Sequence, residues 1–213
     1  MKPLRDRPQA RWLFSQFALP RGLLGSLAGA IMARGNADMA RLTLDMLQPE
    51  PAERVLEIGF GPGVAIELLA EHVTAGLVAG VDPSQVMLNQ AVRRNRQAIV
   101  TGRIDLRLGS SDHIPWADGT FDRACSINNV MLWNLRTDVR EVRRVLRQAG
   151  RLVIAVHKWT LGGESGGLLR LGATFPSLEG VVQALEGAAF RDLDVRRLPT
   201  RSGPAVFVVA QAS

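Results

Sequence analysis

Short apolar runs alternate with amphipathic stretches along the chain from residue 54 onward. The apolar runs predict strands over Val55–Ile58, Leu77–Val81, Ile104–Leu108, Phe121–Ile127 and Arg151–Val156. Between them, apolar residues at spacings of three and four predict helices over Val64–Val73, Ser84–Gln97 and Asp138–Gln148. This alternation predicts an α/β fold with a mostly parallel sheet and helices on both faces.

The pattern changes after residue 157. A glycine-rich stretch, Leu161–Gly172, leads to a helix expected over Ser177–Ala189. Two β-rich runs follow, Asp192–Leu198 and Ala205–Ala210, and the short link between them predicts an antiparallel pair at the end of the sheet.

The helix expected before the fifth strand carries a start and a stop signal. Asp138 followed by Glu141 resembles a capping box, and Gly150 follows the predicted end. Four arginines recur at helical spacing here: Arg140, Arg144, Arg147 and Arg151. They allow two interpretations, a stripe that follows phosphates or the solvated face of a helix. The second is favoured, because no aromatic residues interleave with the arginines to stack on bases.

Residues 1–50 precede this pattern and predict an N-terminal helical extension, with residues 51–213 as the main domain. Its apolar segment, Trp12–Met32, is interrupted by arginines, a proline and glycines. One interpretation is a pair of helices that covers the ligand site as a lid. The other is a basic amphipathic element that lies on a membrane surface or accepts a lipid-like substrate, which would make the protein peripheral to a membrane.

Composition narrows the class of protein. The 213 residues are 46% hydrophobic and 22% charged, which is typical of a globular domain. The single cysteine, Cys125, predicts no internal disulfide, and no run approaches the roughly 20 apolar residues of a membrane span. With no secretory signal visible, we expect a cytoplasmic protein. The net charge of +6 comes almost entirely from arginine, which codon bias explains as readily as a phosphate-bearing partner.

The strongest local signal is a glycine loop where the first predicted strand ends. Gly59, Gly61 and Gly63 stand between this strand and the next helix, and ligands of parallel sheets bind at such a place. Asp82 follows the second strand about 20 positions later. In nucleotide-binding sheets, a carboxylate at this place accepts hydrogen bonds from the hydroxyls of a ribose. Its alternative role is to cap the helix that begins near Ser84.

The loop favours S-adenosylmethionine over a dinucleotide. The dinucleotide fingerprint needs a third glycine at position 64, which is Val64 here. Glu57 precedes the first glycine by two residues, and its carboxylate suits the ammonium of a methionyl group and would repel a pyrophosphate.

These residues resemble motifs I and II of class I S-adenosylmethionine-dependent methyltransferases. Further similar segments are 114–122, before the fourth strand, and 142–154, the helix and fifth strand. The resemblance covers residues 54–157 and is nearest to the small-molecule "methyltransferase type 11" branch, which includes quinone-biosynthesis enzymes. It implies a Rossmann-like, seven-stranded sheet with a reversed last strand.

The resemblance also implies residue roles. It assigns to the cofactor Glu57, Gly59, Phe60, Gly61, Gly63, Asp82, Pro83, Met87, Ser110, Ser111, Asp112 and Asn128. Pro83 and Met87 would pack on the adenine. Many members carry Gly-Asp-Ala after the third strand, where this chain has Gly109-Ser110-Ser111-Asp112, so either Ser110 or Asp112 would read the adenine amino group. Asn128 would border the methyl group and the acceptor.

Methyl transfer requires the acceptor to be held in line with the methyl group, and proximity alone supplies roughly 7–11 kcal/mol. A general base is needed only if the acceptor must lose a proton. His157, at the end of the fifth strand, is the candidate catalytic base beside Asn128; the chain has no tyrosine. No metal-ligand spacing stands out, and no Asn-Pro-Pro-aromatic signature of nucleic-acid methylation follows the fourth strand.

The sequence therefore predicts an enzyme that uses S-adenosylmethionine, without a metal, to methylate a small, hydrophobic acceptor, with nucleic acid disfavoured as a partner. One alternative is a phospholipid head-group or other membrane-lipid methyltransferase. Another is a non-catalytic methyltransferase-fold module that binds its cofactor or nucleic acid without turnover, and a nicotinamide dehydrogenase is the most distant.

Overall fold

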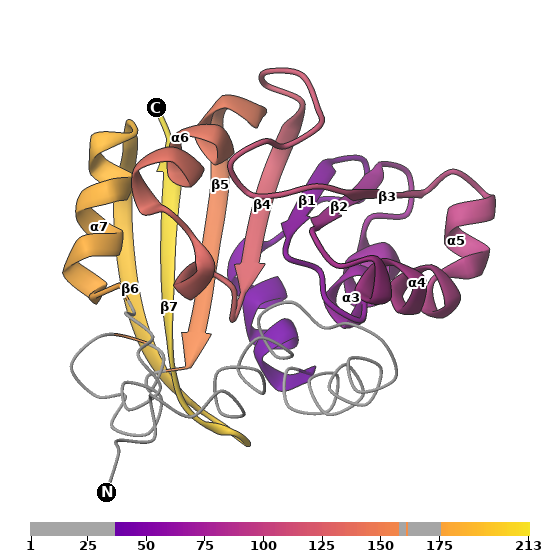
Figure 1. The fold of residues 1–213 in the computed structure, drawn as a ribbon, viewed down its shortest axis with the longest axis horizontal. Coiled ribbons are helices and arrows are strands. Elements are labelled where there is room, and N and C mark those ends of the chain that lie inside the picture. The colour runs from indigo at the N-terminus through magenta and orange to yellow at the C-terminus, as the bar shows by residue number, and fades with distance from the viewer. Residues whose placement is uncertain (1–36, 158–160, 162–175) are drawn as a thin grey trace, which may run out of the picture.

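A single sheet of seven strands organises the part of the chain that the computed structural model describes, residues 37–157, 161 and 176–213 (Figure 1). The strands are β1 (Arg54–Ile58), β2 (Leu77–Asp82), β3 (Ile104–Leu108), β4 (Phe121–Ile127), β5 (Leu146–His157), β6 (Phe190–Thr200) and β7 (Gly203–Ala212). Their order across the sheet is β3-β2-β1-β4-β5-β7-β6. Strands β1 to β5 pair in parallel, whereas β7 runs antiparallel to both neighbours. This confirms the predicted α/β sheet with its reversed last strand.

Helices cover both faces of this sheet. Residues 37–47 are helical, and the chain then forms α3 (Val64–His72), α4 (Gln85–Arg94), α5 (Arg96–Val100), the short 3-10 helix η2 (Val130–Leu132), α6 (Leu135–Val145) and α7 (Leu178–Gly187). Figure 1 shows α6 and α7 over the half of the sheet that holds β5, β6 and β7, and α3 and α4 beside the other half. The helix before β1 is the only described part of the expected N-terminal extension; residues 1–36 lie outside the described residues.

Strand residues alternate between two apolar clusters, as the period of two in a strand requires. On one face, Leu56 and Ile58 of β1 pack with residues of α6 and α7 such as Val142 and Leu185. On the other face, Val55 of β1 packs with the helix over 37–47, with α3 and with α4. The sheet is thus buried on both sides, and only its edges and strand ends reach solvent.

One predicted helix is in fact two. The pattern predicted a continuous helix over Ser84–Gln97, but α4 ends at Arg94 and α5 begins at Arg96. Asn95 breaks the helix because its side-chain amide donates hydrogen bonds to the carbonyl of Ala91 (3.0 Å) and to the carbonyl of Gly63 (3.2 Å), which belongs to another segment.

The helix before β5 is shifted toward the N-terminus relative to the prediction. It begins at Leu135 and ends at Val145, so Asp138 lies in its first turn instead of capping it, and Gly150 lies within β5. The predicted capping box is wrong because Asp138 and Glu141 bind elsewhere: Asp138 accepts from Ser111 (2.7 Å), and Glu141 accepts from the backbone of Ile114 (2.8 Å).

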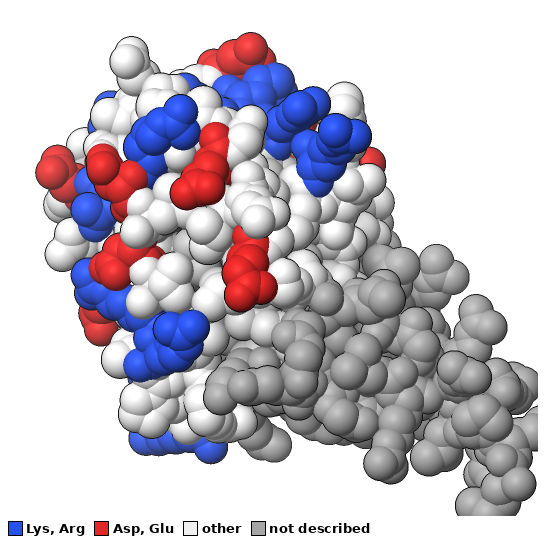
Figure 2. Space-filling model, turned by 90° about the vertical axis from the view of Figure 1, so that its left-hand side faces the viewer, with Lys and Arg blue, Asp and Glu red and all other residues white. Residues whose placement is uncertain are grey.

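The predicted arginine series therefore does not follow one helix, since Arg147 and Arg151 belong to β5. Arg144 is bound to Glu141 and Asp118, both at 2.7 Å, and Arg147 to Asp122 at 2.6 Å. On the face turned toward β6 and α7, Figure 2 shows basic and acidic side chains interspersed. This mixture offers no continuous basic stripe on that face for a phosphate backbone.

No helix among the described residues is long and apolar enough to cross a membrane. The segments on which the membrane-contact interpretation rests, in residues 1–36, lie outside the described residues, as does most of the glycine-rich stretch over 161–172.

Candidate functional site

A cavity of about 410 Å³ opens where the parallel strands end, at the carboxyl edge of the sheet. Its lining comes from the ends of β1 to β4 and from the segment that leads into α6: Ile58, Gly59, Val81, Pro83, Gly109, Ser110, Ser111, Asp112, Asn129, Leu132, Asn134 and Asp138. Parallel α/β sheets bind ligands at this edge. Among the residues predicted for the cofactor, Gly59, Pro83 and Ser110 to Asp112 line the cavity together.

The glycine loop meets this cavity at Gly59, whereas Gly61 and Gly63 do not line it. Gly59, Gly61 and Gly63 all adopt left-handed backbone conformations, with φ of +74°, +50° and +79°, which side chains with a Cβ rarely adopt. A Cβ built on Gly61 would meet no atom of the described residues within 4 Å, so they leave open space above the backbone there. A ligand can therefore approach the main chain closely at Gly61.

Asp82 holds the loop in this shape. Its two carboxylate oxygens accept hydrogen bonds from the backbone N–H groups of Gly61 (2.9 Å) and Ser84 (2.8 Å). Burial raises the pKa of Asp82, and these two hydrogen bonds oppose that shift. The side chain thus joins the loop to Ser84 at the start of α4, without capping that helix itself. Ser84 itself caps α4 by accepting from the N–H of Met87.

Glu57 lies behind the loop and does not line the cavity. Its buried carboxyl group accepts from the N–H of Ile66 in the first turn of α3. Its Oε2 atom has no hydrogen-bond partner in the structure. Burial, and secondarily the nearby Asp82 carboxylate, raise the pKa of Glu57 well above its usual range. Without a cation beside it, this carboxyl group therefore favours its neutral form.

The segment after β3 supplies the polar wall of the cavity. The hydroxyl of Ser110 donates to Asp112, and the hydroxyl of Ser111 donates to the buried Asp138 at 2.7 Å. Asp138 also accepts from the hydroxyl of Thr137 at 2.8 Å. The side chains of Ser110, Ser111 and Asp112, which the sequence predicted for the cofactor, thus line the same cavity as Asp138. The sequence had predicted Asp138 as a helix cap.

Asn129, and not Asn128, faces the cavity from the end of β4. Its amide donates to the carbonyl of Ile58 at 3.0 Å, and it occupies the space where a Cβ of Gly59 would lie. Asn128 has a left-handed φ of +53°, and its amide instead contacts Met39 Sδ and accepts from the backbone N–H of His157 (3.0 Å). Of the two asparagines, Asn129 lines the cavity and the predicted Asn128 does not.

His157 is buried at the carboxyl end of β5, beside this asparagine. The carbonyl of Pro204 is a hydrogen-bond partner of the imidazole, and the Asp38 carboxylate lies close enough to act on it. Burial lowers the pKa of His157, with both neighbours opposing the shift. The folded protein thus shifts the imidazole toward its neutral form.

Two other predicted residues lie in the core. The ring of Phe60 packs against the position where Gly80 lacks a Cβ, and Met87 faces the sheet from the first turn of α4. Neither lines the cavity, because both are drawn to the apolar face of the sheet under α3 and α4. Pro83 remains as the predicted apolar contact for a ring in the cavity.

Besides Ile58, Val81 and Gly109 at the ends of β1 to β3, the lining residues after β4 were missed from the sequence: Asn129, Leu132, Asn134 and Asp138. The signal available for them was their position between the end of β4 and the first turn of α6, which parallel topology brings to the ligand edge. Among the described residues, no group of three or more His, Cys, Asp and Glu side chains is arranged to hold a metal ion.

Comparison with known proteins agrees with this geometry. Residues 55–150 match a family model described as a methyltransferase domain. An uncharacterized methyltransferase of Bacillus subtilis, YdaC, is 29% identical over 131 residues, which are 61% of this chain and 70% of that protein. The ubiquinone/menaquinone biosynthesis C-methyltransferase UbiE of Geotalea daltonii is 30% identical over 118 residues, 54% of this chain and 49% of that enzyme.

The fold is also that of a solved methyltransferase. The crystal structure of geranyl diphosphate C-methyltransferase from Streptomyces coelicolor, in complex with Mg²⁺, geranyl diphosphate and S-adenosylhomocysteine, superimposes with a TM-score of 0.73 at 14% identity. The match covers 99% of this chain and 100% of that chain.

Proposed function

We propose that this chain, which belongs to the class I S-adenosylmethionine-dependent methyltransferases, methylates a small, hydrophobic acceptor. The reaction would take place at the carboxyl edge of its sheet. The observation that carries this proposal is the cavity beside the Gly59–Gly63 loop, whose backbone is open at Gly61 and tied to Asp82. S-adenosylmethionine, when bound, supplies a methyl group activated by a sulfonium.

The residues around the cavity fit the adenosine part of this molecule. Pro83 offers an apolar surface for a ring, and Ser110, Ser111 and Asp112 offer oxygens that accept hydrogen bonds from an amino group. Asp82 lies at the end of β2, where each of its oxygens retains capacity to accept from a ribose hydroxyl in addition to its backbone donor. The adenine end is thus assigned to the segment after β3 and the ribose to Asp82.

The methionyl end fits the glycine loop. Gly61 leaves its backbone uncovered, and α3 begins directly after Gly63 with its N–H groups directed outward, which favours a carboxylate. Asn129 lies against Gly59 with a carbonyl oxygen available to an ammonium. Glu57 acts from behind the loop, and an ammonium near its unpartnered oxygen would restore its charged form.

Asn128 and His157 belong to the acceptor end of this proposal. The backbone N–H of His157 donates to the side-chain Oδ1 of Asn128, which ties the end of β4 to the end of β5. If the acceptor is a hydroxyl or an acidic carbon, the neutral imidazole of His157 is the base that takes its proton as the methyl group is transferred. Amine and thiol acceptors need no such base, and the His157→Gln variant separates the two cases by its effect on turnover.

A hydrophobic acceptor is supported by the relatives that are named for apolar small molecules, among them the quinone-biosynthesis enzyme described above and a 24-methylenesterol C-methyltransferase of rice. The N-terminal segment expected to cover the site lies outside the described residues and remains a prediction.

Transfer of a labelled methyl group from S-adenosylmethionine tests the proposal. The acceptors are a panel of phenols, quinols, prenyl alcohols, carboxylic acids and amines, together with phosphatidylethanolamine vesicles. Label in a free small molecule, lost in Asp82→Ala, is the expected result. Label only in the vesicles would favour the membrane-lipid alternative. Binding of S-adenosylhomocysteine with no transfer to any acceptor would favour a non-catalytic module.

A further inference from the structure

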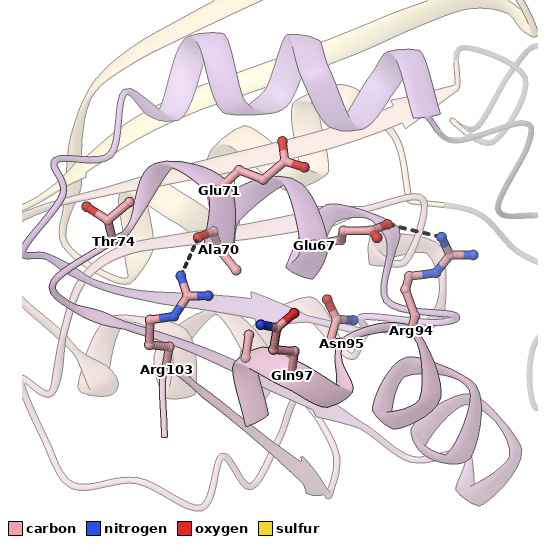
Figure 3. Close-up of a pocket in the computed structure, with 9 residues that line it drawn as sticks. Glu67, Ala70, Glu71, Thr74, Arg94, Asn95, Gln97 and Arg103 are labelled. Atoms are coloured by element: carbon pink, nitrogen blue, oxygen red, sulfur yellow. Dashed lines mark hydrogen bonds and ion pairs between the residues drawn. The ribbon is translucent and has the colours of Figure 1, made fainter. Parts of the chain in front are cut away.

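A second groove shares no lining residue with the cavity and contains two side chains that bind the glycine loop. It has a volume of about 290 Å³ and lies between α3 and the junction of α4 with α5. Figure 3 shows Arg94, Asn95 and Gln97 facing Glu67 and Ala70 of α3 across it. Both arginines of the groove bind within the protein, Arg94 to Glu67 at 3.1 Å and Arg103 to the carbonyl of Ala70 at 3.0 Å.

Two residues of this groove hold the glycine loop through its carbonyl groups. Arg94 Nε donates to the carbonyl of Pro62 at 3.1 Å. Asn95 Nδ2 donates to the carbonyl of Gly63 at 3.2 Å. These contacts join the last two residues of the loop to a segment 32 positions later in the chain.

Asn95 is built into this position. Its side chain is only 5% exposed, and its second bond, to Ala91, breaks the helix that the sequence pattern predicts. A Cβ on Gly63 would come within 2.8 Å of Asn95 Nδ2 and of Ala91 Cβ, so the loop and the helix break fit closely against one another. A break in a regular helix at a buried polar residue is an expected signature of a functional constraint.

The direction of the loop peptides follows from these two bonds. A trans peptide is planar, so a carbonyl held on one side directs the following N–H to the other. With the Gly63 carbonyl bound to Asn95 and to the N–H of Glu67, the N–H of Val64 points out of the amino end of α3. Asp82 fixes the loop from the ligand side at Gly61, while Arg94 and Asn95 fix it from behind at Pro62 and Gly63.

We propose that Arg94 and Asn95 are positioning residues for the methionyl end of S-adenosylmethionine, acting through the carbonyl groups of Pro62 and Gly63. This proposal rests on the proposed function. Neither side chain lines the cavity, and each binds a carbonyl group of the loop, so each acts through the loop. Their removal takes one bond each from the Pro62 and Gly63 carbonyl groups and leaves only the backbone bonds to hold the loop peptides, so the loss falls on ligands that contact the loop.

The experiment compares two ligands by isothermal titration calorimetry. S-adenosylhomocysteine carries the amino-acid portion, whereas 5′-methylthioadenosine retains only the nucleoside and the sulfur. For Asn95→Ala and Arg94→Ala, we expect the Kd for S-adenosylhomocysteine to rise about tenfold, the equivalent of one lost buried hydrogen bond. The Kd for 5′-methylthioadenosine should change by less than about twofold, because its contacts lie at the adenosine end of the cavity.

Two variants in the same groove serve as controls. Glu67→Gln removes the ion pair of Arg94 but leaves its bond to Pro62, and Arg103→Ala removes an arginine that binds the far end of α3. Both should bind the two ligands as the wild type does. Arg94 is about one-third exposed, so Arg94→Ala provides the test if Asn95→Ala does not fold.

Three results would overturn the account, and they are distinguishable. Unchanged affinity of folded Arg94→Ala and Asn95→Ala for S-adenosylhomocysteine removes the positioning role. An equal loss of affinity for both ligands shows that the substitution loosens the whole fold and does not act through the glycine loop. A folded wild type that binds neither ligand contradicts the proposed function itself.

Discussion

Alanine at Gly59 should cost more stability than alanine at Gly61, whereas alanine at Gly61 should stand in the path of the ligand. At Gly59, with φ of +74°, a Cβ would lie 2.0 Å from Asn129 Nδ2. The left-handed conformation costs about 1–2 kcal/mol for an L-residue. Displacing Asn129 loses its bond to Ile58, about 0.5–1.5 kcal/mol more. We therefore expect Gly59→Ala to lower the free energy of unfolding by about 2–3 kcal/mol.

At Gly61 only the conformational cost applies, because a Cβ there meets nothing within 4 Å. We expect Gly61→Ala to cost about 1–2 kcal/mol of stability. Its methyl group, however, would stand in the space through which a ligand approaches the loop, so the Kd for S-adenosylhomocysteine should rise by about tenfold or more.

Urea unfolding followed by circular dichroism measures the first effect, and calorimetric titration measures the second. A double-mutant cycle tests the assigned clash: in the Asn129→Ala background, Gly59→Ala should cost about 1 kcal/mol less than in the wild type. Equal destabilisation by the two glycine variants, or a cycle with no coupling, would refute the reasoning.

Three further predictions concern charged groups. Arg123→Ala should lower the free energy of unfolding by about 1.5–3 kcal/mol, because Arg123 binds Glu53 at 2.7 Å and the last carbonyl of the helix before β1. Arg196→Ala, which removes an exposed ion pair, should lower it by less than about 1 kcal/mol; similar losses for the two variants in urea unfolding would contradict this. Since the pKa of His157 is lowered in the folded state, the unfolded chain binds more protons just below pH 6.5. Stability should therefore fall on acidification through that window, and a His157→Gln protein with the same slope of stability against pH would exclude His157 as the cause. Glu57 should give the opposite pH dependence of stability, because its pKa is raised in the folded state. The wild type should therefore lose stability relative to Glu57→Gln as the pH rises above 4.5, and parallel stability profiles of the two proteins would disprove this.

The order of elements and the first half of the site were predictable from the sequence because they depend on local patterns. A buried strand followed by glycines at alternate positions locates both the turn after β1 and the edge of the sheet at which ligands bind. Parallel pairing of β1 and β2 then brings Asp82 beside the glycine loop. The segment from Ser110 to Asp112 follows its strand directly and lines the same cavity.

The remainder depends on contacts between distant segments, which periodicity does not contain. Asn95 ends a helix because a carbonyl of Gly63 lies within its reach. Asp138 resembles a cap in the sequence, but in the fold it accepts the hydroxyl of Ser111. Asn128 and Asn129 are chemically identical neighbours, and only the left-handed backbone after β4 decides which of them faces the cavity.

The central claim is that Asp82 and the glycine loop bind an S-adenosyl ligand. Calorimetric titration of the wild type and of Asp82→Ala with S-adenosylhomocysteine tests it most directly. The account predicts binding to the wild type in the micromolar range and a loss of at least about tenfold in Asp82→Ala, since that variant lacks both the ribose contact and the bond that shapes Gly61. Absence of binding to the folded wild type, or equal affinity of the two proteins, would contradict it.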